Sequence, residues 1–265
     1  MAGPDMAQAG HSLVISQPMY FPWVGMLEQI RLSDTYVFYD DVQFSSGPAN
    51  RVSRVQVKTA NGMRWMTVPL RGRHLGSLIG ELELDDRTDW RSSHRDLLRQ
   101  SYRGAPYLRD MLALVDEVFS APVRYLSELS RASTMALVRY FGLEAGRTFL
   151  DSSALGVPGH SSERVFALCR QLGATRYLTG HGARDYLDHS LFEQAGVDVD
   201  YMAYRLSPYP QRHGDFTPYV TGLDLVANRG REGVRHICSG TEPWRTVCAG
   251  RVPASVPTGI EHEQA

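Results

Sequence analysis

The chain has 265 residues, of which 43% are hydrophobic, so it is long and apolar enough to form a substantial core. Its 28 basic and 29 acidic side chains give a formal net charge of −1, which argues against a protein that coats a polyanion through its overall charge. No apolar run approaches the roughly 20 residues that are needed to cross a bilayer.

The first elements along the chain predict a βαβ unit. Residues 12–16 form a short apolar run typical of a strand, residues 24–32 predict a helix, and residues 36–40 predict a second strand. Two strands that are separated by one helix in so short a stretch are expected to pair in parallel.

A hairpin and a helical segment are expected next. Residues 54–58 and 64–70 alternate in polarity on either side of Asn61-Gly62, a dipeptide that favours a two-residue turn. A further strand is expected at residues 79–84. Three helices are then predicted, at residues 89–103, 107–119 and 123–141.

The α/β pattern then resumes. Strands are predicted at residues 148–151, 176–179 and 197–203, and helices at residues 161–172, 183–195 and 223–228. The predicted fold class is therefore α/β, with a mainly parallel, Rossmann-like sheet.

We expect one α/β domain over residues 12–230, with the hairpin (51–84) and the helical segment (89–141) inserted in it. Residues 1–11 are expected to be disordered and residues 231–265 to form a poorly ordered tail. In such sheets ligands bind beyond the carboxyl ends of the strands, which favours the loops at residues 17–23, 40–44 and 180–182.

Lysine and cysteine usage excludes several classes of protein. Lys58 is the sole lysine beside 27 arginines, and it lies on a hairpin expected to be exposed. A P-loop lysine is therefore absent and Schiff-base chemistry is not expected. Three cysteines without close pairing (Cys169, Cys238 and Cys248) fit reduced thiols, and the first eleven residues lack the features of a signal peptide. A cytoplasmic location without membrane contact is expected.

An acidic pair follows the second predicted strand. The side chains of Asp40 and Asp41 are expected to point to opposite faces, so one catalytic and one structural role are more consistent with them than a shared proton. Either aspartate could instead cap a helix or a turn.

Basic residues gather in the predicted hairpin and the helix that follows it. Residues 51–73 contain six basic and no acidic side chains, and the next helix repeats arginine every fourth residue. Both patterns suit an anionic ligand with several phosphates, such as tRNA, although a solvated arginine surface is the competing interpretation. The candidate nucleic-acid contacts are Arg54, Lys58, Arg64, Arg91, Arg95 and Arg99.

Histidines and small residues provide further candidates. His94 lies between the apolar and the arginine side of its helix and could shuttle a proton or simply pack. Gly180-His181-Gly182 follows a strand and opens a helix, which suits an anion or only a tight turn. Ser153 allows the same two interpretations. The spacing of His181, Asp185, Asp188 and His189 matches no tight metal pattern, so neither a metal site nor a cofactor is predicted.

Several segments together resemble the WbqC-like family. They include residues 15–27 (ISQPMYFPWVGML), 34–44 (DTYVFYDDVQF), 65–69 (WMTVP), 172–183 (LGATRYLTGHGA) with Arg164 before it, and 224–230 (DLVANRG). The resemblance implies a small-molecule transferase of surface-polysaccharide or natural-product biosynthesis, moving an aminoacyl group to an amine or a hydroxylamine. At Gly47-Pro48-Ala49 this chain lacks the aromatic residue that relatives often carry.

A second likeness concerns layout alone. The first strand, the aromatic loop and the helix are similar in arrangement to the H-x-G-H region of nucleotidyltransferases and class I aminoacyl-tRNA synthetases. Both histidines and the lysine-rich second signature are absent here. The likeness implies that recognition of an aminoacyl-adenosine could persist without adenylate chemistry.

The two resemblances together imply an enzyme that transfers an aminoacyl group from an activated donor, such as aminoacyl-tRNA, to a small amine, hydroxylamine or amino-sugar acceptor. We expect Asp40 or His94 as the general base and Arg51 as the partner of a phosphate or carboxylate. Tyr20 and Trp23 would stack on an adenine. The other candidate pocket residues are Gln17, Asp41, Gln43, Asn50, Ser153, Gly180, His181, Gly182, Tyr186, Gln211 and Asn228. The alternatives are an ATP-using ligase or nucleotidyltransferase and a non-catalytic binding subunit.

Overall fold

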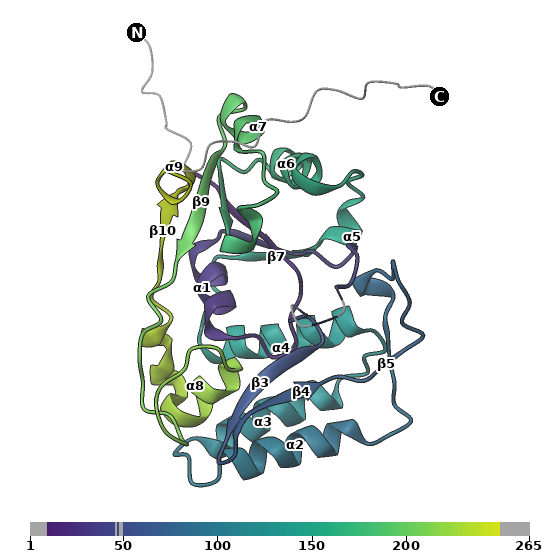
Figure 1. Cartoon of the computed structure of the whole chain (residues 1–265), viewed down its shortest axis with the longest axis vertical. Coiled ribbons are helices and arrows are strands. Elements are labelled where there is room, and N and C mark those ends of the chain that lie inside the picture. The colour runs from purple at the N-terminus through teal and green to yellow at the C-terminus, as the bar shows by residue number, and fades with distance from the viewer. Residues whose placement is uncertain (1–9, 46, 48–49, 250–265) are drawn as a thin grey trace, which may run out of the picture.

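A computed structural model describes residues 10–45, 47 and 50–249. Within these ranges six strands form the central sheet, in the order β10-β9-β8-β1-β2-β7. Neighbouring strands are parallel except for β9 and β10, so the predicted α/β class with a mainly parallel sheet is confirmed (Figure 1). The strands are β1 (Ser12–Ser16), β2 (Thr35–Phe38), β7 (Thr148–Asp151), β8 (Arg176–Thr179), β9 (Asp198–Ala203) and β10 (Gly240–Pro243).

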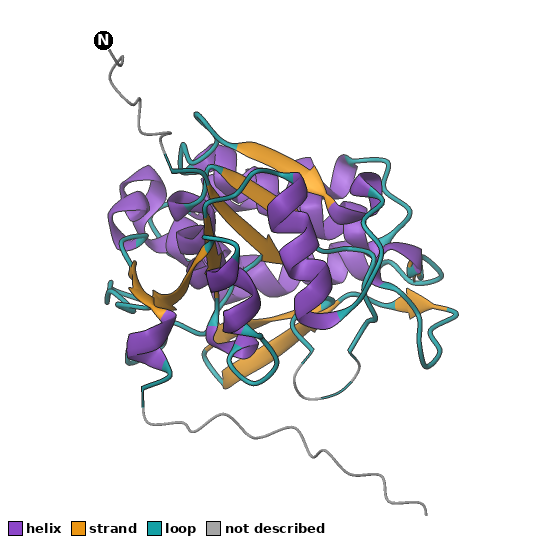
Figure 2. Ribbon diagram, turned by 90° about the horizontal axis from the view of Figure 1, so that it is seen from above, coloured by secondary structure: helices purple, strands orange, loops and turns teal. Residues whose placement is uncertain are grey.

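Alternating side chains of the strands pack on opposite faces of the sheet, as the pleat requires. On one face Val14 and Tyr36 join a core cluster with α1 (Val24–Leu32), α4 (Leu126–Tyr140) and α8 (Gly222–Arg229). On the other face Leu13 and Val37 pack with α6 (Ser161–Gln171) and α7 (His189–Gln194). Figure 2 shows the sheet covered by helices on both sides, which explains why the inner strands are apolar over residues 13–15 and 36–38.

The strand order changes direction between β1 and β8. From β1 the chain passes through α1 to β2, on one side, whereas from β8 it passes through α7 to β9, on the other side. The loops that follow β1 and β8 therefore diverge at the carboxyl edge of the sheet. Such a divergence leaves a crevice, where open α/β sheets bind ligands.

The predicted insertion lies between β2 and β7. It contains the β3 (Arg54–Thr59) and β4 (Gly62–Thr67) hairpin, the short pair β5 (Leu70–Arg71) and β6 (Glu83–Leu84), and the helices α2 (Trp90–Ser101), α3 (Leu108–Ser120) and α4. The hairpin packs against α2. The strand expected at residues 79–84 is wrong in part, because Ile79–Glu81 form a 3-10 turn, η1.

Two predictions near the termini are also corrected. Residues 231–249 do not form a poorly ordered tail: they contain η3 (Gly230–His236), β10 and α9 (Trp244–Val247). The local pattern misses β10 because this short strand contains glycine and proline and forms by pairing with β9. His11 is likewise held, since its backbone N–H donates to Thr175 Oγ1 over 2.9 Å. Residues 1–9 and 250–265 lie outside the described residues.

No helix in the described ranges is both long and apolar enough to span a bilayer.

The loop between β1 and α1 is buried and held by its backbone. The Tyr20 N–H donates to the Val52 carbonyl over 3.0 Å, and the Phe21 N–H donates to Ser133 Oγ over 2.9 Å. Phe21 adopts a positive φ of 39° although it carries a large side chain, which costs free energy that the surrounding contacts must offset. The loop therefore has one conformation imposed on it by the hairpin and by α4.

His94 joins α2 to this loop. Its ring is 9% exposed and packs 5.2 Å from the Trp90 ring, and Nδ1 lies 3.1 Å from the Tyr20 hydroxyl. Burial lowers the pKa of His94 to about 4, although a hydrogen bond to the Thr67 backbone acts in the opposite direction. The imidazole is therefore neutral at pH 7.

The depressed pKa of His94 makes folding dependent on pH. In the unfolded chain the imidazole takes up a proton below about pH 6.5, whereas the folded protein resists protonation until about pH 4, so stability is lost as the pH falls through this window. Between pH 7 and pH 4.5 we expect His94 to contribute a loss of ~2–3 kcal/mol in the free energy of unfolding. Urea unfolding of the wild type and of His94→Gln checks this, and the variant should lose less stability over the same range. The exposed His74→Gln is the control and should follow the wild type; three equal slopes would contradict the prediction.

Candidate functional site

A cleft of about 890 Å³ lies at the carboxyl edge of the sheet, where the loops after β1 and β8 diverge. We call it the sheet-edge cleft. Of the residues that the sequence singles out, the fold brings these to its walls: Gln17, Trp23, Asp41, Gln43, Gly180, His181, Gly182 and Tyr186. They come from three different crossovers, which explains why residues so distant in sequence share one cavity.

Asp40 does not reach this cleft. Its Oδ1 accepts hydrogen bonds from Ser152 Oγ and from the Ser153 N–H, both at 3.0 Å, and its Oδ2 accepts one from Ser153 Oγ at 2.7 Å. The carboxylate is 8% exposed and fastens the end of β2 to α5 (Ser152–Leu155). This placement does not fit a general base that contacts a substrate. Ser153, a predicted pocket residue, donates its hydroxyl and its N–H to Asp40 and does not line the cleft either.

Asp41 lies on the cleft wall and pairs with Arg164 of α6. Arg164 is also held by the Val157 carbonyl, to which Nε donates over 3.0 Å, and its guanidinium lies 5.1 Å from the centre of the Tyr39 ring. A buried arginine requires such partners because an unpaired charge would be costly to desolvate. The Ser152 hydroxyl also lies 2.5 Å from Asp41 Oδ1, so Ser152 links the two carboxylates of the acidic pair, and each carboxylate has a further partner of its own.

The aromatic side of the cleft centres on Trp23 and Tyr204. Their ring centres are 5.1 Å apart, and the Tyr204 hydroxyl accepts a hydrogen bond from Gln29 Nε2 at 2.8 Å. Burial raises the pKa of Tyr204 to about 12, so its hydroxyl stays protonated at neutral pH. The Trp23 ring lies over Gly25, where a Cβ would come within 2.3 Å of it. Glycine at position 25 therefore sets the position of the indole.

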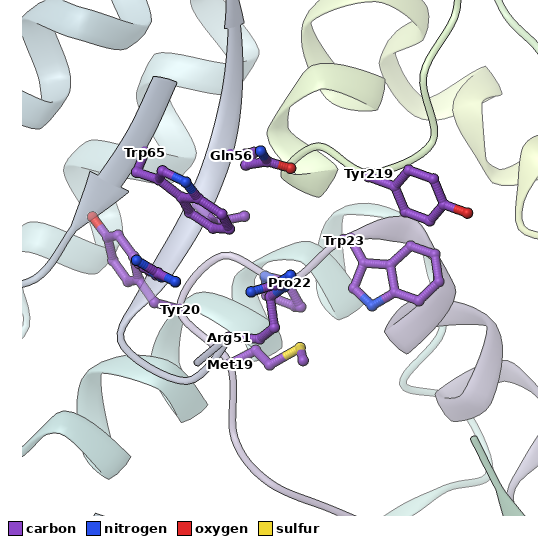
Figure 3. A pocket seen from close by; sticks show the side chains of 10 residues that line it. Met19, Tyr20, Pro22, Trp23, Arg51, Gln56, Trp65 and Tyr219 are labelled. Carbon is purple, nitrogen blue, oxygen red and sulfur yellow. The ribbon is translucent and has the colours of Figure 1, made fainter. Parts of the chain in front are cut away.

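A second cavity of about 550 Å³ adjoins the first and shares Met19 and Trp23 with it. We call it the aromatic cavity. Figure 3 shows Trp65 on one side, Trp23 and Tyr219 on the other, and Gln56 between them. Tyr20, one of the predicted stacking residues, lines it as well, with its hydroxyl directed to His94.

Two arginines stack on Trp65 at the edge of the aromatic cavity. The guanidinium carbons of Arg51 and Arg54 lie 5.0 and 4.2 Å from the ring centre. Both also donate to backbone carbonyls: Arg51 to Asn50, and Arg54 to Asn50 and Gly47. These contacts orient the two cations next to an aromatic surface.

Other predicted pocket residues have hydrogen-bonding roles away from both cavities. Asn50 forms a turn through its Oδ1, which accepts the N–H groups of Val52 and Ser53. Gln211 bridges Tyr209 and Thr217. Asn228 donates to Asp224 of its own helix.

Lys58 is buried, contrary to the exposed position expected from the hairpin. The side chain is 6% exposed, and its ammonium donates to Gln211 Oε1 over 3.2 Å, to the Gly214 carbonyl over 3.1 Å and to the Asp215 carbonyl. The loop at residues 209–217 covers this end of the hairpin and provides acceptors for the charge. Lys58 is therefore not accessible to a nucleic acid, and its prediction as a nucleic-acid contact is wrong.

Carboxylates neutralise the predicted arginine stripe on α2. Arg91 pairs with Asp86 at 2.5 Å, Arg95 with Asp116 at 2.6 Å and Arg99 with Asp96 at 3.1 Å. These pairs reduce the repulsion between like charges four residues apart, so the stripe is explained without an anionic partner. Arg64 is exposed on β4.

Several residues that line the cavities carry no local sequence signal of a functional role. They are Gln56, Trp65, His160, Arg164, Tyr204 and Tyr219. Trp65 and Arg164 belong to segments that carry the family resemblance, and alternation along the hairpin puts Gln56 on the same face as Arg54. The others lie in loops without a local pattern. Over the described ranges no group of three or more His, Cys, Asp or Glu residues could hold a metal ion.

Comparisons with known proteins agree with the resemblance. Residues 17–236 match the WbqC-like protein family. The uncharacterized protein Rv1507c of Mycobacterium tuberculosis is 31% identical over 224 residues, which cover 83% of this chain and 94% of that protein. No solved structure matches the chain. The match over residues 17–236 includes the loop after β1, the hairpin, all of the aromatic cavity and all of the sheet-edge cleft except Ile15 and Ser16. The chain therefore belongs to the WbqC-like protein family.

Proposed function

We propose that the protein is a transferase that moves an aminoacyl group from aminoacyl-tRNA to a small amine-bearing acceptor. The observation that carries this proposal is the pair of adjoining cavities, which share Met19 and Trp23 as a common wall. A transferase has to hold two substrates with their reacting atoms in contact, and two joined compartments of different chemistry meet this need.

The aromatic cavity suits the nucleoside end of the donor. Aromatic rings bind bases by stacking, and Arg51 and Arg54 stand beside them for phosphates. Between Asp41 and Glu81 the sequence has no acidic residue, so this part of the surface favours an anion.

The sheet-edge cleft suits the acceptor and the reacting aminoacyl group. The amides of Gln17 and Gln43 supply donors and acceptors, and the exposed His181 supplies an imidazole. The change of direction between β1 and β8 supports a Rossmann-like fold whose ligand lies at this edge.

In the proposed reaction the acceptor nitrogen attacks the carbonyl carbon of the aminoacyl ester. A C–N bond forms as the N–H proton passes to His181, the C–O bond to the ribose breaks, and the ribose oxygen takes that proton. His181 replaces Asp40 and His94 as the proposed base because it lines the cleft, whereas they lie outside both cavities. The ester is already activated, so the reaction consumes no ATP. Lys58, the one lysine, is occupied by carbonyl oxygens.

The proposed donor also indicates where the reaction takes place. Aminoacyl-tRNA is cytoplasmic, so we place the reaction there. The product would be an amide that enters surface-polysaccharide or natural-product biosynthesis, the setting that the family resemblance implies.

The first test is a transfer assay with labelled aminoacyl-tRNAs and a panel of small amines. We expect product formation that RNase abolishes and that does not depend on added ATP, because the ester bond supplies the free energy. An ATP requirement with release of pyrophosphate would instead indicate a ligase or nucleotidyltransferase. Absence of transfer with every charged tRNA would indicate a binding subunit.

The role of His181 is tested by His181→Ala in the same assay. General base catalysis typically contributes roughly 10²- to 10⁴-fold, so kcat should fall by about that factor while the KM for aminoacyl-tRNA changes little. His74→Ala is the matched control, since His74 is exposed and lies outside both cavities. An unchanged kcat in His181→Ala would remove the histidine from the mechanism.

Gly25→Ala tests the shared wall. The new Cβ would displace the Trp23 ring, so kcat/KM should fall by a factor that corresponds to the loss of one base stack, roughly 1–3 kcal/mol. Stability should fall as well, because the displaced ring loses its contact with Tyr204, and Gly25 lies in the first turn of α1, where the helix propensity of alanine offsets little of that loss. Gly240→Ala in β10, where a Cβ meets nothing within 4 Å, is the control for the substitution itself. Full activity of Gly25→Ala would show that the position of Trp23 does not matter.

A further inference from the structure

Gln56 is held on the wall of the aromatic cavity by the register of the hairpin. It pairs with Trp65 across β3 and β4, and directly paired residues project from the same face of a sheet. Its neighbour Val57 is fully buried on the opposite face, which fixes this orientation. The Gln56 carbonyl also accepts a hydrogen bond from the Thr221 N–H at 2.9 Å.

The opposite wall is joined to the hairpin by backbone hydrogen bonds. Thr221 forms a bridge with Trp23, and the Gly222 N–H donates to the Pro22 carbonyl over 2.7 Å. Tyr219 precedes this segment, and its ring centre lies 6.1 Å from that of Trp23. The aromatic cavity is therefore preformed, and a ligand that enters it meets rings and an amide that are already in place (Figure 3).

Figure 3 shows Gln56 between Trp65 on one side and Trp23 with Tyr219 on the other, and Arg51 and Arg54, which also line the cavity, stack on Trp65. A glutamine amide presents one donor and one acceptor side by side, which match N7 and the N6 amino group of adenine. The arginines lie where phosphates attached to the nucleoside would be neutralised. Aromatic rings for stacking, an amide for the base edge and two neighbouring guanidinium groups for phosphates are typical of a nucleotide-binding site.

We propose that the aromatic cavity is an adenosine nucleotide subsite in which Gln56 recognises the base. The adenine lies between Trp65 and the Trp23–Tyr219 side, its N7 and N6 bond the Gln56 amide, and its phosphates face Arg51 and Arg54. This inference rests on the proposed function, in which the nucleotide is the terminal adenosine of the donor. The same chemistry would accept free AMP, so the test includes both sources.

The experiment is a calorimetric titration of the full chain with AMP and with IMP, which replaces the N6 amino group by a carbonyl oxygen. Loss of a bidentate base contact lowers the binding affinity by roughly 5- to 150-fold, so AMP should bind more tightly than IMP by a factor in that range. Gln56→Met should abolish the preference for AMP and leave the unfolding midpoint in urea within the error of the wild type. Gln100→Met, at an exposed position on α2, should keep the preference.

A second arm separates the sources by titrating the trinucleotide CCA against CCG. Preference for CCA indicates the tRNA terminus, and preference for AMP without CCA binding indicates a free nucleotide; both support an adenine subsite. Equal binding of AMP and IMP, failure of both AMP and CCA to bind, or a preference that survives in Gln56→Met would overturn the inference. These titrations need no catalysis, so their outcome is independent of the transfer assay. If RNase left the transfer reaction intact, the proposed function would be refuted, whereas the adenine subsite would still be judged by the titrations.

Discussion

The rest of the structure depends on satisfying the buried backbone of the loop between β1 and α1. Tyr20, Phe21 and Pro22 are buried, so the peptide groups of these residues need partners within the protein. Val52 of the hairpin, Ser133 of α4 and Gly222 of α8 supply them, and Thr221 Oγ1 donates to the Phe21 carbonyl over 2.9 Å. Four segments that are distant in sequence are thereby locked in one arrangement, and the positive φ of Phe21 is part of it.

This arrangement also separates the two cavities. Met19 and Trp23 come from the same loop and face both, so one short segment forms the wall between an aromatic, arginine-edged compartment and a polar one. A wall whose backbone is hydrogen-bonded moves little when a ligand binds. Such rigidity suits a protein that has to align two substrates rather than to enclose one.

The charged side chains at the site and on α2 are likewise bound by specific partners within the protein. Asp40 is held by two serines, Asp41 by Arg164, and the arginines of α2 by aspartates. Arg51 and Arg54 contact an aromatic ring and backbone carbonyls, and these contacts orient both guanidinium groups. Their place at the edge of the aromatic cavity is the reason why the proposed nucleotide site uses the hairpin rather than the regular stripe on α2.

The amino-acid sequence by itself determined the local elements and the edge of the sheet at which a cleft forms. The strands at residues 148–151 and 176–179 and the helix at residues 24–32 are predicted with the bounds that the structure has, because each depends on the periodicity of its own residues. The family is also evident from short segments. Only the tertiary structure decided that Asp40 binds Ser152 and Ser153, that Lys58 is buried under the loop at residues 209–217, and that Gln56 and Trp65 share a cavity with Trp23. Each of these depends on a partner more than 30 residues away along the chain, and a partner at that distance is selected by packing, which leaves no local pattern.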